Sequence, residues 1–262
     1  MLHSQEGLNQ HLTEPIQEGF NLTQEEVQEA LKAAQKAKDA IDRKQKYWEL
    51  VKNGPKKPNH ITAEEMLEDL VELCEAESIP FVIDEANKPV IELLTWYFTD
   101  DPRFEEFDPS YSLSKGLYLF GGVGVGKTHM MKLFRCMQKH MFRMVDCTDI
   151  SAEYKKEGED GIAKYFTDHP VQRHNYWNHE KCGFCFDDLG VESDGRYFGN
   201  QVNVMERIIE KRYRHRDSLV THIISNLTVK QVEDRYGVRI RERCREMFNV
   251  VVFPPNAVSR RK

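Results

Sequence analysis

An octapeptide near the middle of the chain, GGVGVGKT, has residue types and spacing that can hold phosphate groups. It matches the pattern of Gly, four residues, Gly, Lys and then Ser or Thr. Glycines let backbone N–H groups close around a β-phosphate, Lys127 can reach the β- and γ-phosphates, and the Thr128 hydroxyl can ligate Mg²⁺. We therefore expect a site for ATP and Mg²⁺. The residues expected to hold the nucleotide are Gly121, Gly122, Val123, Gly124, Val125, Gly126, Lys127, Thr128 and His129.

The sequence on both sides of this octapeptide suits a phosphate loop. Residues 116–120, GLYLF, form a short apolar run typical of a buried parallel strand. Residues 129–141 carry apolar side chains at helical spacing. A strand, a glycine loop and a helix N-terminus together favour anion binding, because unpaired N–H groups and the helix dipole face the phosphates. This context makes a chance glycine-rich turn a poor alternative.

A second segment, FCFDDLGVE at residues 184–192, ends an apolar strand with two acids. Downstream of a phosphate loop it reads as a Walker B element, in which Asp187 holds Mg²⁺ through water and Asp188 polarises the attacking water. The alternative is that the two acids only cap a following helix. Most ATPases of this type have Glu at the second position, and Asp is shorter, so we expect slow hydrolysis. Glu192 is a second candidate for the same role.

A third segment, THIISN at residues 221–226, ends an apolar strand with Asn226. An amide at that point can hydrogen-bond the γ-phosphate or the attacking water, which is the role called sensor 1. Asn at a strand end is more often a turn residue, so the order of this segment after the other two is what favours the functional interpretation.

A fourth segment, YGVRIRERCREM at residues 236–247, is rich in arginine. Arg239 and Arg243 are four residues apart and share one helix face, as do Arg241 and Arg245. The arginines either form a solvated face paired with neighbouring glutamates or include a finger that completes the ATP site of a neighbouring subunit. The order of the segments favours the finger.

The remaining pattern predicts an α/β fold with a parallel sheet sandwiched by helices, because strands alternate with helices along the chain. Further strands are expected at residues 142–147, 183–190, 219–226 and 249–253, and helices at 86–98, 151–166, 200–216, 228–237 and 238–248, with a loop between 100 and 116.

The N-terminal third has a different composition. Residues 1–20 lack periodicity and are expected to be disordered. Capping boxes at Thr23 and Thr62 begin two helices, which the PKKP at residues 55–58 separates. We expect residues 21–84 to form a helical N-terminal module that either docks a partner or packs on the main domain. The ATPase domain is expected at residues 85–262.

The overall composition excludes several classes of protein. The net charge of −6 argues against a general polyanion binder, and no apolar run is long enough for a membrane span. Without a signal peptide we expect a cytoplasmic protein whose cysteines are reduced, namely Cys74, Cys136, Cys147, Cys182, Cys185 and Cys244. The CxxC formed by Cys182 and Cys185 could bind zinc with His169, His174 or His179. We favour a strand, in which these two side chains point to opposite faces.

The four motif segments, in this order, resemble AAA+ ATPases of the DnaC/DnaI helicase-loader group, and the resemblance covers about residues 85–262. It implies a P-loop NTPase fold and ATP-dependent self-association into an oligomer. It also implies two partners, a replicative ring helicase and single-stranded DNA. By the same resemblance, Arg239 and Arg243 are the paired arginines of the finger, of which we favour Arg243. The closing Ser259, Arg260 and Arg261 resemble an ending common in the group.

Other functions stay open at this point. A transposition helper ATPase of the IstB type shares the same core motifs. A small-molecule kinase with a phosphate loop would need an arginine-rich lid, and a nucleotide-gated interaction module would bind ATP with little hydrolysis. Basic residues at 155–156 and 211–216 are candidates for DNA contact, although solvated helix faces explain them as well.

Overall fold

The computed structural model describes residues 23–53, 61–79, 81–135, 141–170, 181–197, 200–255, 257 and 259–260. Five parallel strands form its central sheet in the order β2-β4-β7-β1-β8. Their bounds are β1 Gly116–Phe120, β2 Phe142–Asp146, β4 Lys181–Leu189, β7 Thr221–Ser225 and β8 Phe248–Val252. A short antiparallel strand, β3 at His169–Pro170, pairs with the start of β4.

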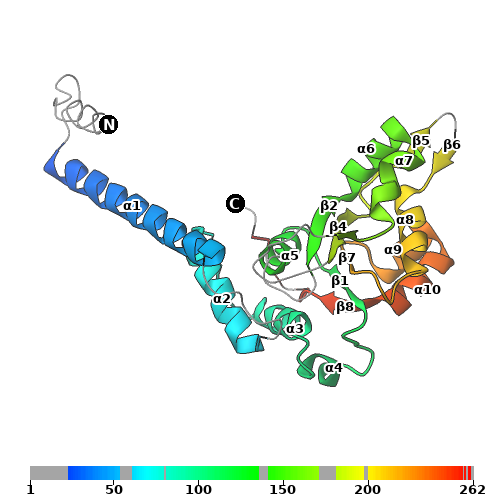
Figure 1. The fold of residues 1–262 in the computed structure, drawn as a ribbon, viewed down its shortest axis with the longest axis horizontal. Coiled ribbons are helices and arrows are strands. Elements are labelled where there is room, and N and C mark those ends of the chain that lie inside the picture. The colour runs from blue at the N-terminus through cyan, green and yellow to red at the C-terminus, as the bar shows by residue number, and fades with distance from the viewer. Residues whose placement is uncertain are drawn as a thin grey trace, which may run out of the picture.

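Helices cover both faces of this sheet (Figure 1). One face packs against α2, α3 and α5, and the other against α6, α8, α9 and α10. The bounds of the helices are α1 Gln24–Asn53, α2 Ala63–Ala76, α3 Lys88–Phe98, α4 Arg103–Phe107, α5 Lys127–Phe134, α6 Cys147–Glu157, α7 Glu159–Ile162, the 3₁₀ helix η1 Ala163–Tyr165, α8 Val204–Tyr213, α9 Val229–Tyr236 and α10 Val238–Met247.

Strand β1 shows why the sequence produces this sandwich. Leu117 and Leu119 are fully buried in the cluster that contains α3 and α5, while Tyr118 between them lies in the cluster on the opposite face. Successive side chains of a strand point to opposite faces, so a continuous apolar run supplies both cores at once. The expected fold class, an α/β fold with a parallel sheet sandwiched by helices, is confirmed.

Three expected elements differ from the structure. The helix predicted at residues 151–166 begins earlier, at Cys147 after the Asp146 cap, and is divided into α6, α7 and η1 because Gly158 ends α6. The helix predicted at residues 200–216 begins at Val204, because the Asn203 side chain accepts a hydrogen bond from the Glu206 N–H and caps it there. The residues before it form a small hairpin of β5 (Gly195–Tyr197) and β6 (Asn200–Val202), which sequence patterning missed. The predicted loop at residues 100–116 also contains the short helix α4.

The two N-terminal helices have different surroundings. Nearly every described residue of α1 is exposed, and this helix extends away from the sheet (Figure 1). Its C-terminal part is tied to the end of α2, because both Trp48 and Lys44 contact the Glu77 carboxylate. Both predicted capping boxes are present. Residues 1–20 and the PKKP segment lie outside the described part of the chain.

Helix α2, in contrast, shares the main core. Its apolar face contributes Met66, Leu70 and Cys74 to the same buried cluster as α3, α5 and the sheet. The helical module and the main domain are therefore joined by a continuous core at α2. None of the described helices has the length and apolar character needed to cross a bilayer.

We predict that two Leu→Ala substitutions in these helices have very different costs. Leu70 is fully buried in α2, so Leu70→Ala should lower the free energy of unfolding by about 2–4 kcal/mol through lost burial and cavity formation. Leu31 in α1 is 64% exposed, and Leu31→Ala should change it by less than about 0.5 kcal/mol. Denaturant unfolding measures both. Equal costs would contradict the shared core at α2.

Candidate nucleotide-binding site

The register of the sheet brings three of the predicted motifs to one edge. Ser225 of β7 is level with Phe120 of β1 on one side and with Leu189 of β4 on the other. The phosphate loop therefore starts beside Asn226, the residue that follows β7. The acidic end of β4 reaches the same edge, as parallel strands require.

Lys127 is the centre of the hydrogen-bonding network at this edge. Its side chain is buried, and its Nζ donates to the carbonyl oxygens of Gly121 at 2.8 Å and Gly122 at 2.7 Å. The same Nζ donates to Asn226 Oδ1 at 2.5 Å. A buried ammonium group needs such acceptors. The structure thus brings the predicted phosphate-binding lysine and the predicted sensor amide into direct contact.

Thr128 and Asp187 form a second contact across the site. The Thr128 hydroxyl donates to Asp187 Oδ1 at 2.9 Å. Burial raises the pKa of the Asp187 carboxyl, and the neighbouring Asp188 raises it further, whereas the hydrogen bond from Thr128 lowers it. Hydroxyl and carboxylate oxygens suit Mg²⁺, and a cation would favour the ionised carboxylate, so these two side chains fit the predicted metal.

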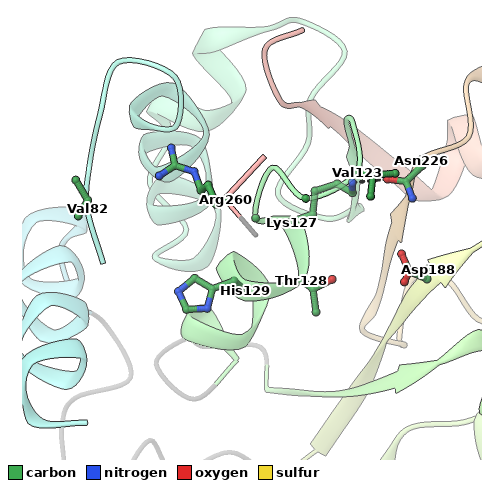
Figure 2. Close-up of a pocket in the computed structure, with 10 residues that line it drawn as sticks. Val82, Val123, Lys127, Thr128, His129, Asp188, Asn226 and Arg260 are labelled. Carbon is green, nitrogen blue, oxygen red and sulfur yellow. Dashed lines mark hydrogen bonds between the residues drawn. The ribbon is translucent and has the colours of Figure 1, made fainter. Parts of the chain in front are cut away.

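Asp188 is placed by an irregular end of β4. The pairing of β4 with β7 shifts register between Phe186 and Leu189, and Asp188 has a left-handed backbone with φ of +54°. Such a bulge re-aims side chains, and a non-glycine residue with positive φ is uncommon and costs energy. Asp188 consequently faces the same cavity as Lys127 and Thr128 (Figure 2).

The cavity has a volume of about 460 Å³. Of the nine residues predicted to hold the nucleotide, six line it, while Val125 packs in the core and the Gly121 and Gly122 carbonyls hold Lys127. The His129 side chain is one of the lining residues, and burial and then the charges of Lys132 and Arg260 lower its pKa. The lining residues are Val82, Val123, Gly124, Gly126, Lys127, Thr128, His129, Asp188, Asn226 and Arg260 (Figure 2).

Val82 and Arg260 were missed as site residues from the sequence. The Arg260 N–H donates to the Gly124 carbonyl at 2.9 Å, and its guanidinium pairs with Asp84 at 2.5 Å. Gly124 has φ of +82°, and a Cβ there would lie 2.3 Å from the Ser259 hydroxyl. The C-terminal segment thus packs closely on the phosphate loop. The Ser-Arg ending was the only signal for Arg260, and nothing in the pattern marked Val82.

The two candidate finger arginines have opposite exposure. The Arg243 side chain is 10% exposed, forms a short ion pair with Glu210 and stacks on the Tyr213 ring at 5.0 Å. The Arg239 side chain is 76% exposed and lies 3.7 Å from Glu210. Both extend from α10, and neither is among the described residues that line the chain's own cavity. Arg243, which the sequence favoured, would have to leave Glu210 to reach a neighbouring chain.

Other basic candidates are engaged within the chain. Arg241 contacts Glu233 and Glu242, and Arg245 lies 3.3 Å from Glu242. Arg212, part of the basic run at 211–216, is fully buried and donates to Asp168 at 2.6 Å. Arg212 therefore belongs to the core and cannot contact DNA.

The cysteine pair lies in β4 as expected. Cys182 and Cys185 are both buried, and Cys185 packs in the cluster on the α3 and α5 side of the sheet. Among the described residues no group of three or more His, Cys, Asp and Glu side chains could hold a metal ion. Two of the three histidines considered as ligands, His174 and His179, lie outside the described residues.

Comparisons with known proteins give one kind of match. No protein-family model matches the sequence, and no curated protein matches it. Among solved structures, the chain is similar to one described as a proposed primosome component from Streptococcus pyogenes serotype M3. The identity is 19% and the TM-score 0.45, over 70% of this chain and 87% of that one. At these values the similarity gives no information on substrate or partner.

We predict that Asp187→Asn stabilises the protein while weakening its response to Mg²⁺. The raised pKa means that folding disfavours the ionised carboxylate, so at pH 7 the charge costs stability, and this cost disappears as falling pH protonates Asp187. The variant should raise Tm at pH 7 by about 2 °C, and the difference should shrink at lower pH.

Thermal unfolding with and without ATP·Mg²⁺ measures both effects, with Asp217→Asn as the control because its side chain is 95% exposed. If Asp187→Asn kept the full stabilisation by ATP·Mg²⁺, Asp187 would not hold the metal.

Proposed function

We propose that this chain is an ATP-binding and ATP-hydrolysing AAA+ protein that acts in DNA replication as a helicase loader. It assembles on ATP, contacts single-stranded DNA and delivers a ring helicase. The observation that carries the proposal is the convergence of Lys127, Thr128, Asp188 and Asn226 on one cavity of about 460 Å³. A lysine, a hydroxyl, an acid and an amide around one phosphate loop are the groups that phosphoryl transfer to water requires.

Each of these residues has a distinct role in the proposal. Lys127 and the N-terminus of α5 hold the phosphates, and Asn226 orients the γ-phosphate or the attacking water. Thr128 and Asp187 would hold Mg²⁺, which when bound neutralises charge on the phosphate oxygens. Asp188 accepts a hydrogen bond from water in the cavity and so orients it for attack.

Assembly would complete the site from a neighbouring subunit. Arg239 is the exposed member of the arginine pair on α10, so it can reach a neighbour by giving up only its longer ion pair with Glu210, at 3.7 Å. Arg243 is buried against Glu210 and Tyr213, where it supports the helix that carries Arg239. We therefore prefer Arg239 as the finger and assign Arg243 to holding α10 in place.

The N-terminal module is the proposed docking element for the helicase. Helix α1 extends away from the sheet and exposes apolar side chains without a partner element along most of its described length (Figure 1). The most exposed of them are Val27, Leu31, Ile41 and Trp48. Amphipathic helices with such an apolar face typically bind in a hydrophobic groove of a partner protein. In the proposed division, residues 21–84 dock the partner, with α2 as the anchor, and residues 85–262 bind ATP.

We assign contacts with single-stranded DNA only to basic side chains that are exposed. Of the two basic segments considered, Lys155, Lys156 and Arg214 are exposed. Lys155 donates to Ser193 and Lys156 lies 3.0 Å from Glu157, and both side chains remain exposed at the surface. These three cations would give an electrostatic contact with the DNA backbone and no base readout.

A second candidate, a nucleotide-gated module with little hydrolysis, is favoured by one observation. The acid at the end of β4 is Asp188, one methylene shorter than the usual Glu. The turnover of the unmodified protein decides between the two candidates: measurable hydrolysis supports the ATPase, and tight binding without turnover supports the module.

We predict that ATP·Mg²⁺ causes this chain to assemble with the ring helicase of the same source, and that Lys127→Ala abolishes the effect. Without its ammonium group the loop should bind ATP at least about 100-fold more weakly, because buried charge-assisted hydrogen bonds to phosphate are lost. Native mass spectrometry with ATP and with ADP measures the complexes. Lys132→Ala, an exposed lysine of the same helix, is the control.

Two results would contradict this proposal in different ways. Unchanged assembly of Lys127→Ala would rule out a nucleotide-driven switch. Self-assembly on ATP without helicase binding would keep the switch and indicate a different client, such as a transposase.

We predict that Arg239→Ala cuts hydrolysis by about 100-fold and leaves ATP binding and Tm unchanged, because a finger acts only on the transition state. Arg243→Ala should instead destabilise the protein by about 1–3 kcal/mol, since it leaves Glu210 without its close partner. Turnover, nucleotide titration and thermal unfolding measure the three effects, and Arg245→Ala is the exposed control.

Addition of subunits with an intact finger should partly restore turnover to Arg239→Ala. If Arg243→Ala abolished turnover at unchanged Tm while Arg239→Ala stayed active, Arg243 would be the finger. A loss of ATP binding in either variant would rule out the finger role for that residue.

A further inference from the structure

Glu192 follows the acidic end of β4 and is buried, with an exposure of 3%. The sequence offered it as a substitute for the short acid Asp188, but it is absent from the described lining of the cavity. Its Oε2 accepts the Gly190 N–H at 2.7 Å, and its Oε1 accepts a short hydrogen bond from the Tyr236 hydroxyl. Both carboxylate oxygens therefore bind protein groups outside the nucleotide site.

The loop that Glu192 holds begins at Asp188, the carboxylate proposed to orient the attacking water. Asp188 has φ of +54°, and Gly190 has φ of +106°, a conformation that glycine adopts easily. A Cβ at Gly190 would lie 2.4 Å from Leu227 Cδ1, and the Leu189 carbonyl accepts the Ser225 hydroxyl at 2.7 Å. The backbone at Asp188 is thus fixed on one side by the end of β7 and on the other by Glu192.

The second hydrogen-bond partner of Glu192, Tyr236, belongs to the helices that carry the arginines. Tyr236 is the last residue of α9, and Gly237 joins it directly to α10, which carries Arg239. Arg235 reinforces the contact, because its guanidinium donates to the Glu192 carbonyl and lies 3.4 Å from Oε1. Burial, and then the charge of Glu192, raise the pKa of Tyr236, so its hydroxyl remains a donor at ordinary pH.

We propose that Glu192 is a positioning residue that couples the backbone at Asp188 to α9 and α10, and so aligns the arginine segment with the nucleotide state of the chain's own site. The inference rests on the proposed function and deepens it. A buried carboxylate cannot lose either hydrogen bond without a desolvation penalty. A shift of the Gly190 N–H toward or away from the cavity therefore carries Tyr236, and the start of α10, with it.

Three substitutions isolate this contact. Tyr236→Phe removes the hydroxyl and keeps the ring in the core. Glu192→Gln keeps the size of the side chain and one acceptor oxygen, so it should retain part of the coupling. Tyr165→Phe is the matched control, because Tyr165 is another buried tyrosine whose hydroxyl donates to a glutamate, Glu153, at 2.8 Å, away from the cavity.

The experiment is hydrogen exchange of the full chain with and without Mg²⁺ and adenosine 5′-(β,γ-imido)triphosphate. In the unmodified protein and in Tyr165→Phe, nucleotide should slow exchange by roughly ten-fold both in the phosphate loop and in residues 229–247. In Tyr236→Phe the loop should keep its protection, while the effect on residues 229–247 should fall below about two-fold. Glu192→Gln should give an intermediate value.

The two readouts separate failure of the coupling from failure of the proposed function. Equal protection of residues 229–247 in Tyr236→Phe and the unmodified protein would overturn the role of Glu192. Protection of the phosphate loop alone in the unmodified protein would overturn it as well. If nucleotide protected neither segment, the result would contradict the proposed ATP binding and, with it, the proposed coupling.

Discussion

The parallel register of β4, β7 and β1 is the constraint on which the rest of the site depends. Phe120 is level with Ser225, so the next residues, Gly121 and Asn226, begin their loops side by side. Leu189 is level with the same serine from the other side. A slip of one residue would turn every buried side chain of a strand to the opposite face, so packing of both cores enforces the register. The positions of Lys127, Asn226 and Asp188 relative to one another follow from it.

Two cationic side chains, Lys127 and Arg260, bind oxygen acceptors at the phosphate loop. The Lys127 ammonium has the carbonyl oxygens of Gly121 and Gly122 and the amide oxygen of Asn226 as acceptors, and Arg260 has the Asp84 carboxylate. A phosphate oxygen is an acceptor of the same class with more charge, so ligand binding can exchange one partner for another. If Arg260 exchanged Asp84 for a phosphate oxygen, the segment between α2 and α3 would lose this ion pair, because Asp84 lies in that segment.

The sequence was sufficient for the parts of the site that are local. A motif, an apolar strand before it and a helix after it are encoded in consecutive residues, and the end of a parallel strand always meets the same edge. Contacts between distant segments were not readable in this way, since Arg260 and Asp84 are 176 residues apart. The opposite exposure of Arg239 and Arg243 depends on Glu210 of another helix. The start of α8 was misjudged because the Asn203 cap competes with helix propensity before it.

The short acid at the end of β4 shows how backbone and side chain can substitute for each other. Asp reaches less far than Glu, yet Asp188 lines the cavity because the bulge and its left-handed conformation bring its backbone there. Such a conformation costs on the order of 1–2 kcal/mol and persists only where neighbours hold it. Here Ser225 holds Leu189, and Glu192 holds Gly190. Asp188, the end of β7 and, through Glu192, helices α9 and α10 are therefore connected at one strained point of the backbone. A change at any of them has to be accommodated by the others.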